Sequence, residues 1–200
     1  RLRELTLAQG SASFKIEESE DGNVLFSADG SELIACPGLF HSSYTVPEGT
    51  IRIRDRAFNG SYSESIGGSA QNDGHAVVGY GLVEITFPST LKKIGDAAFF
   101  ECNRLKAIDL PAGLEYIGMQ AFGSTDLTGT IGLGSIGFEK DAIGKVTIGK
   151  NVRWIGQGAF NSFEVKEFVV EKGNWHYTTK NGRLMTRDGR TEVDVYGERA

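Results

Sequence analysis

The stretch Leu110-Pro111-Ala112-Gly113-Leu114-Glu115-Tyr116-Ile117-Gly118-Met119-Gln120-Ala121-Phe122 carries the pattern that decides the fold of this chain. Its leading apolar residue is followed after seven positions by an isoleucine, and the isoleucine is followed after five positions by a phenylalanine. The same offsets recur three more times along the chain. The four sets are Val46, Ile53 and Phe58; Phe87, Ile94 and Phe99; Leu110, Ile117 and Phe122; and Ile148, Ile155 and Phe160.

Other positions of this unit recur with the same spacing, so the similarity is not confined to three residues. An alanine precedes every one of the four phenylalanines, a proline follows the leading residue in three copies, and a glycine follows the isoleucine in three copies. The shared positions are a leucine slot (Thr50, Leu91, Leu114, Val152), a proline (Pro47, Pro88, Pro111), a glycine (Gly95, Gly118, Gly156) and an upstream apolar residue (Tyr44, Ile85, Ile108, Val146).

The physical chemistry of one unit predicts two short extended segments joined by a turn. Residues 105–110 alternate near their end as a strand with one buried face does, and Pro111 then interrupts strand pairing. A second short segment ends at Gly118, and Phe122 points back toward the interior. One such unit cannot bury its own apolar side chains, whereas stacked copies bury them against each other. The repeat therefore predicts a β-rich solenoid.

The string from Leu110 to Phe122, and its second copy from Phe87 to Phe99, resembles the BspA-type leucine-rich repeat of bacterial cell-surface and secreted proteins. Cys102 matches the small residue that this family places three positions after the phenylalanine. The resemblance implies a right-handed leucine-rich-repeat coil with short strands and little helix. It also implies an extracellular or cell-surface location in a bacterium and a role in adhesion.

We expect one solenoid domain over residues 1–200, with one irregular repeat. Residues 127–145 contain apolar residues that suggest a strand, but no Ala-Phe pair follows them in register. We interpret this segment as one shortened repeat. Ile143 is either part of a degenerate Ala-Phe turn or the start of the next strand.

Both ends of the chain carry a similar sequence that predicts an inserted β-hairpin. Asp21-Gly22 and Asn181-Gly182 each lie between alternating segments, and both dipeptides favour tight hairpin turns. The hairpins follow expected solenoid strands at residues 2–7 and 165–170, and each is succeeded by a second matching turn, Asp29-Gly30 or Asp188-Gly189. We assign 8–40 to a hairpin insertion and 171–200 to a C-terminal hairpin cap that protects the last repeat.

Residues 60–81 form the longest expected loop and are rich in glycine, serine and asparagine. Long loops on rigid scaffolds often carry function, and this loop contains Tyr62, His75 and Tyr80. A flexible connection without a ligand is the alternative interpretation.

The composition argues against nucleic-acid and membrane-spanning functions. The formal net charge is −5 with no Lys/Arg stripe, whereas duplex-binding proteins carry a basic surface. No apolar run approaches the roughly 20 residues that a transmembrane helix needs. Because the chain opens at Arg1 without a signal peptide, we expect it to be a processed piece of a longer protein.

Motifs that usually accompany catalysis are weak in this sequence, and we expect no enzyme activity, cofactor or metal. Gly132 to Gly137 match G-x-G-x-x-G, but the chain that follows is too short for the helix of a dinucleotide site. The acidic turn at Glu17 to Gly22 lacks the ligand spacing of a calcium loop. The three histidines show no metal-binding spacing, and we expect His176 on a half-exposed strand and Cys36 and Cys102 in the core.

The function predicted from these observations is a protein- or glycan-binding adhesion module, and the alternative is a structural spacer without a ligand of its own. Aromatic residues just before the isoleucine could stack on a sugar or anchor a protein, or pack under a neighbouring loop. We expect a monomer that contacts a protein or glycan on host or neighbouring cells. The candidate ligand-contact surface is Thr45, Glu84, Thr86, Asp109, Tyr116, Thr147, Trp154 and Glu167, with Ala107 and Val169 beside it.

Overall fold

The computed structural model describes residues 5–8, 11–18, 23–36, 43–58, 82–100, 102, 105–123, 142–161 and 164–193. These residues form thirteen β-strands and no helix. The strands are β1 (Phe14–Glu17), β2 (Val24–Ser27), β3 (Glu32–Ala35), β4 (Ser43–Thr45), β5 (Arg52–Ile53), β6 (Glu84–Thr86), β7 (Lys93–Ile94), β8 (Tyr116–Ile117), β9 (Ala142–Ile148), β10 (Trp154–Ile155), β11 (Glu164–Val170), β12 (Tyr177–Lys180) and β13 (Arg183–Thr186).

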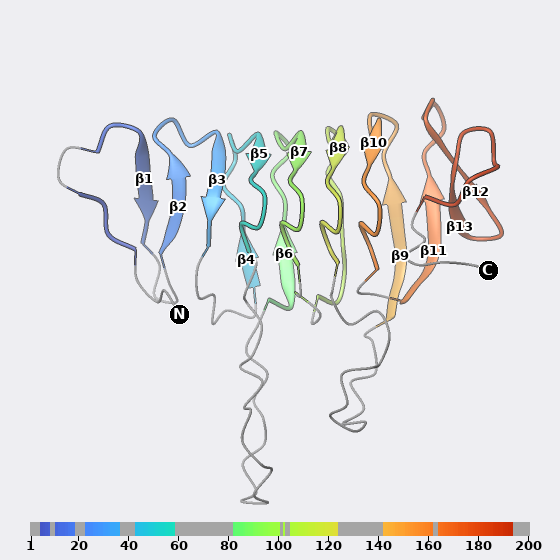
Figure 1. The fold of residues 1–200 in the computed structure, drawn as a ribbon, viewed down its shortest axis with the longest axis horizontal. Coiled ribbons are helices and arrows are strands. Elements are labelled where there is room, and N and C mark those ends of the chain that lie inside the picture. Colours follow the sequence, from blue (N-terminus) through green and yellow to red (C-terminus); the bar gives the residue numbers. More distant parts are fainter. Residues whose placement is uncertain are drawn as a thin grey trace, which may run out of the picture.

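The second short segment of every repeat joins one seven-stranded sheet. Its order is β1-β2-β3-β5-β7-β8-β10, and the strands from β3 to β10 pair in parallel. The isoleucines of the repeat lie in register across this sheet, from Ile53 through Ile94 and Ile117 to Ile155. Figure 1 shows these strands side by side along the long axis of the molecule.

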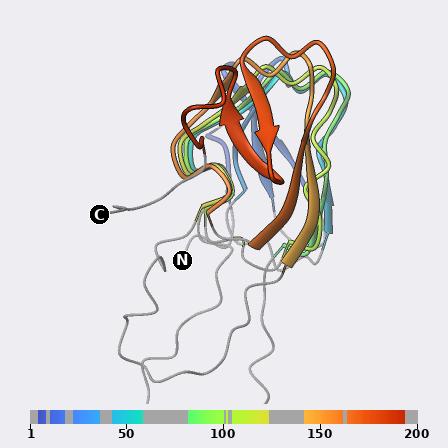
Figure 2. The same ribbon diagram turned by 90° about the vertical axis from the view of Figure 1, so that its right-hand side faces the viewer.

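The first segment of each repeat lies in a second layer. There β4 pairs in parallel with β6, and β9 pairs in parallel with β11. Segment 105–110 runs beside β6, and the N–H of Lys106 donates to the Val83 carbonyl over 3.0 Å. Viewed from the C-terminal end, the strands of the two layers enclose a common interior (Figure 2).

The predicted phenylalanine ladder fills that interior. Phe58, Phe99, Phe122 and Phe160 are each 0–1% exposed. Successive rings stack with centroid separations of 4.6, 5.1 and 5.6 Å and interplanar angles of 15° or less. Of the predicted leading positions, Val46 and Ile148 are buried, whereas Phe87 and Leu110 are partly buried.

Close approach of neighbouring repeats explains the glycine after the isoleucine. A Cβ on Gly95 would lie 2.6 Å from the backbone nitrogen of Asp55 in the preceding repeat. Such contacts essentially never occur, so only glycine fits. Gly118 and Gly156 meet the backbone of the preceding repeat in the same way.

The residue before each Ala-Phe pair has a left-handed backbone. The φ angles are 59° at Arg56, 52° at Ala97, 48° at Gln120 and 65° at Gly158. This turn lets the phenylalanine N–H donate to the alanine carbonyl of the next repeat, as from Phe99 to Ala121 over 2.7 Å. The turn thus links repeats by hydrogen bonds as well as by ring stacking.

The hairpins at the two ends contain the same local motif. The N-terminal pair β1–β2 and the C-terminal pair β12–β13 are both antiparallel. After each, an aspartate oxygen accepts hydrogen bonds from the hydroxyl two residues earlier and the N–H two residues later, at Asp29 and at Asp188. Asn181 and Gly182 both have positive φ, as the predicted Asn-Gly turn requires.

One expected strand needs adjustment, one open alternative is decided, and two segments lie outside the described residues. Of the solenoid strand expected at 2–7, the described residues 5–7 are not in a strand, whereas β11 covers the strand expected at 165–170. Ile143 belongs to β9, so it begins the next strand. The loop 60–81 and the irregular part 127–141 lie outside the described residues.

Candidate functional site

Six of the eight predicted contact residues lie on the second layer. We call its outward surface, formed by β4, β6, segment 105–110, β9 and β11, the β6–β9 face. Thr45 is paired with Thr86 across β4 and β6, and Thr147 and Glu167 lie on the paired strands β9 and β11. The six are exposed apart from Thr147, which is partly exposed; they are Thr45, Glu84, Thr86, Asp109, Thr147 and Glu167.

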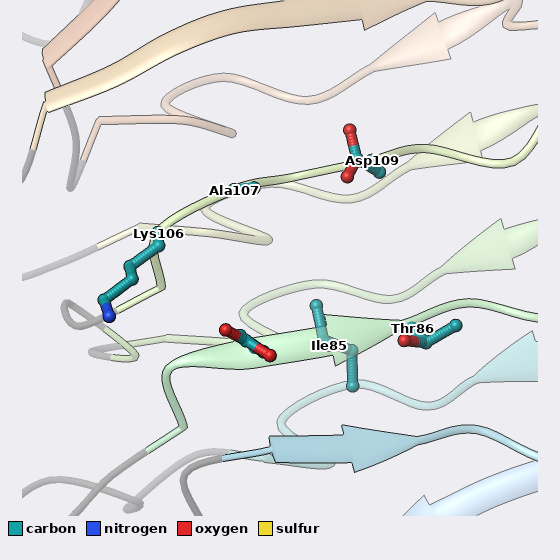
Figure 3. Close-up of a pocket in the computed structure, with 6 residues that line it drawn as sticks. Ile85, Thr86, Lys106, Ala107 and Asp109 are labelled. Carbon is teal, nitrogen blue, oxygen red and sulfur yellow. The ribbon is translucent and has the colours of Figure 1, made fainter.

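A shallow depression of about 220 Å³ lies between β6 and segment 105–110. Figure 3 shows Thr86 on one of these elements and Lys106, Ala107 and Asp109 on the other. Glu84 and Ile85 complete the lining. The depression is smaller than the roughly 300 Å³ at which small-molecule pockets begin, so it suits one functional group of a larger ligand. Sequence reasoning omitted Lys106, although its position beside Ala107 could have indicated it.

The two aromatic candidates lie on the other layer. Tyr116 is on β8 and Trp154 is on β10, in the seven-stranded sheet, and the two residues are register partners. The structure therefore does not bring all eight candidates together. It divides them into a polar group on the β6–β9 face and an aromatic pair on the seven-stranded sheet.

The aromatic pair belongs to a row that also includes Lys93. The Lys93 ammonium lies 4.1 Å from the centroid of the Tyr116 ring, a cation–π contact. The Tyr116 and Trp154 rings stack with centroids 6.3 Å apart and an interplanar angle of 12°. Trp154 is 51% exposed, so it does not pack under a neighbouring loop. We call Lys93, Tyr116 and Trp154 the aromatic row.

Two carboxylates beside the aromatic row accept hydrogen bonds from backbone N–H groups. Asp55 accepts a hydrogen bond from the N–H of Asp96, and Asp96 accepts one from the N–H of Met119. Burial raises the pKa of the Tyr116 hydroxyl; Asp96 and Asp55 raise it further, and hydrogen bonding with Trp154 opposes the shift. The Tyr116 phenol is therefore neutral at neutral pH.

Ion pairs border the row on the same sheet. Arg153 contacts Glu115 at 2.7 Å, and Glu32 contacts both Arg52 and Arg54. These side chains are partly exposed, so each pair stabilises the fold by about 1 kcal/mol or less. Their main consequence is that polar groups surround the exposed aromatic surface.

The remaining motifs of the sequence contribute no site that the described residues show. The G-x-G-x-x-G stretch and most of the acidic turn lie outside those residues, as do His41 and His75. His176 is exposed in a bend before β12 and is not within the strand where it was expected. Cys36 and Cys102 are both buried, as predicted, and burial raises the pKa of the Cys36 thiol well above its usual range.

The described residues contain no group of three or more His, Cys, Asp and Glu side chains placed to hold a metal ion. Nor do they form a helix of the length and hydrophobicity that crossing a bilayer demands.

Repeated strand-turn-strand units with stacked isoleucines and phenylalanines define a leucine-rich-repeat protein. More specifically, residues 39–136 and 74–176 match the BspA type leucine rich repeat region, in six copies. The chain belongs to that family.

The chain is also similar to solved leucine-rich-repeat structures. It is 23% identical to the pneumococcal vaccine antigen PcpA, over 76% of this chain and 36% of that one, with a TM-score of 0.46. It is 18% identical to a leucine-rich repeat protein from Bacteroides ovatus, over 80% of this chain and 40% of that one, with a TM-score of 0.43. It is 15% identical to a leucine-rich repeat protein from Eubacterium ventriosum, over 85% of this chain and 47% of that one, with a TM-score of 0.36. The chain thus spans less than half of each. No curated protein matches it.

Proposed function

We propose that this chain is a recognition module that binds a protein or a glycan outside the bacterial cell, and that it is not an enzyme. The main support for this proposal is the β6–β9 face, where strands paired in register hold polar side chains at a fixed spacing. Backbone hydrogen bonds and the phenylalanine ladder fix these positions, so binding costs little ordering entropy. Membership of the BspA-type family supports a surface location and adhesion.

The depression beside β6 is where we expect the ligand to make its central contacts. Glu84, Asp109 and Lys106 are three of the residues that line it, so its lining includes both acidic and basic side chains. Such a mixed polar lining favours hydrogen-bonding groups over an apolar anchor. The competing proposal is a spacer that holds another domain away from the cell and binds nothing.

Binding of the purified chain to a panel of extracellular matrix proteins and a glycan array tests this proposal. We expect at least one component to be retained. Asp109→Lys should weaken that binding, whereas Glu18→Lys, the same charge change on the exposed end of the β1 hairpin, should leave it unchanged. If nothing is retained, the spacer is the better description. If both variants behave alike, the β6–β9 face is not the binding surface.

We also infer that the repeats form a single closed right-handed coil over residues 1–200, and that the segment 171–200 caps it. The contacts of β12 and β13 with β11 support this cap, and the hairpin lies across the end of the stack (Figure 2). We expect the isolated chain to be a monomer, which its molar mass in solution would test.

A further inference from the structure

The exposed surface of Trp154 has the properties of a stacking site. Its ring is half exposed, and on one side it is supported by the parallel ring of Tyr116. Lys93 in turn lies over Tyr116, and all three residues occupy the same position of consecutive repeats. The strand β10 ends the seven-stranded sheet, so the row ends at Trp154. No other ring among the described residues stacks on it.

The support on one side keeps the indole ring in a single orientation. The backbone N–H of Trp154 donates to the backbone carbonyl of Glu115 in the preceding repeat over 3.3 Å. The next residue, Ile155, is buried and anchors the strand to the core. A ligand ring that stacks here would therefore find the indole already ordered, which lowers the entropy cost of binding.

We propose that Trp154 is the platform of a glycan subsite, in which one face of a pyranose ring stacks on the indole. The C–H groups of a sugar carry partial positive charge and are attracted to the negative face of an aromatic ring. The hydroxyl rim of the same sugar needs hydrogen-bonding groups around that ring. Arg153 and Glu115, which form an ion pair with each other, provide such groups beside Trp154. This subsite deepens the proposed recognition function and lies on the opposite layer from the β6–β9 face.

A protein partner fits this surface less well. Protein interfaces bury about 800 Å² on each side, and their centres are depleted of charge. The Glu115–Arg153 ion pair borders the exposed ring of Trp154, so charged groups lie at the edge of its apolar surface. A small apolar face with a charged rim matches an amphipathic sugar better than a desolvated protein anchor.

Titration with three neutral oligosaccharides, cellotetraose, chitotriose and lactose, tests the subsite by ligand-observed NMR and by calorimetry. We expect at least one to bind with a dissociation constant on the order of 1 mM, typical of a single shallow subsite. Trp154→Ala should weaken that binding by about tenfold or more, and Trp154→Phe should retain part of it. Both variants should unfold like the wild type, because the side chain is half exposed.

The matched control is Phe14→Ala, which removes a 44% exposed aromatic ring from β1, at the opposite end of the seven-stranded sheet from β10. It should bind the sugars like the wild type. The proposal is overturned if none of the three sugars binds at tens of millimolar concentration, or if Trp154→Ala binds as well as Phe14→Ala. It is also overturned if Trp154→Ala loses a protein ligand while sugar binding persists.

Failure of the subsite and failure of the proposed function give different results. Asp109→Lys on the β6–β9 face should leave sugar binding at Trp154 unchanged. A wild-type chain that is retained by the matrix panel but binds no sugar keeps the recognition function and loses the subsite. A chain that binds sugars through Trp154, but whose retention by the matrix panel is unchanged by Asp109→Lys, keeps the subsite and loses the β6–β9 face.

Discussion

The hydroxyl oxygen of Tyr177 accepts a hydrogen bond from the backbone N–H of Ile155 over 2.7 Å. On the opposite side of β10, the N–H groups of Trp154 and Gly156 donate to the preceding repeat, so the N–H of Ile155 faces the open edge of the sheet. A side chain thus occupies the place that the backbone of another repeat would take. Tyr177 follows Val170 by seven positions, which is the isoleucine slot of a fifth repeat.

Asn174 occupies the leucine slot of the same fifth repeat, four positions after Val170. It is 3% exposed. Its amide nitrogen donates to the carbonyls of Gly149 and Val152, and its amide oxygen accepts from the N–H groups of His176 and Tyr177. In the leucine slot of the last repeat, side-chain hydrogen bonds to the backbone of the preceding repeat therefore replace apolar packing.

Replacement of Tyr177 by Phe should destabilise the fold by about 1 to 3 kcal/mol, because it leaves the buried N–H of Ile155 without an acceptor. Chemical denaturation measures this loss, and hydrogen exchange should show faster exchange at the Ile155 amide. His176→Phe, one residue earlier and exposed, is the control and should have little effect. Equal stability of Tyr177→Phe and the wild type would show that the hydrogen bond does not close the edge.

Replacement of Phe122 by Ala should cost about 3 to 5 kcal/mol, since it opens a cavity between two stacked rings. Phe122 lies between Phe99 and Phe160 in the ladder and is fully buried. The control is Met119→Ala, three residues away and 52% exposed, which should change stability by about 0.5 kcal/mol or less. Similar denaturation midpoints for the two variants would contradict the ladder's role.

The spacing of seven and five residues was sufficient to predict the interior. It identified Ile53, Ile94, Ile117 and Ile155 and the four phenylalanines, because an apolar residue at a fixed offset in every copy has to face the same interior. The motif shared by Asp29 and Asp188 was equally visible, since turns of that kind depend on local residue types. These features are encoded within a few consecutive residues.

The left-handed turn before Ala-Phe could not be predicted in the same way. Only Gly158 has the residue type that this conformation favours, whereas Arg56, Ala97 and Gln120 have no such preference. The conformation costs roughly 1 to 2 kcal/mol in a non-glycine residue. It is imposed by hydrogen bonds to the next repeat, as from the Ala97 N–H to the Met119 carbonyl. Contacts between repeats decide it.

The candidate site was only partly predictable for a related reason. Sequence alternation identifies outward positions but not which of two layers they belong to. Asp109 and Tyr116 are seven residues apart and face outward on different layers, because the chain turns after Pro111. The proline turn, which three of the four copies contain, was the signal that could have separated the two groups.

The stability of the turn at Asp29 should depend on pH. Hydrogen bonds from the Ser27 hydroxyl, and from the backbone and hydroxyl of Ser31, lower the pKa of Asp29 from 3.8 to about 2. A carboxylate whose pKa is lowered by folding stabilises the native state above its unfolded pKa, and this contribution disappears as the pH falls toward the folded pKa. The melting temperature of Asp29→Asn should therefore lie below that of the wild type above pH 4, and the two should converge as the pH approaches 2. A difference that stays constant over this range would show that the charge of Asp29 is not involved.

Thr50 is a polar residue in the leucine slot that, unlike Asn174, makes no side-chain hydrogen bond there, and its replacement should stabilise the protein. Its hydroxyl is fully buried without a hydrogen-bond partner among the residues that the structure describes, whereas three other repeats have Leu91, Leu114 and Val152 at this position. Thr50→Val keeps the shape and removes a buried polar group that lacks compensation, so we expect a gain of about 1 kcal/mol. For a chain of this size that corresponds to a rise in melting temperature of about 2 to 4 °C. The matched control is Thr90→Val, because the Thr90 hydroxyl donates to the Thr50 carbonyl and accepts from the Gly49 N–H. That variant should be destabilised, and a stabilised Thr90→Val or a destabilised Thr50→Val would show that the two hydroxyls have been assigned the wrong roles.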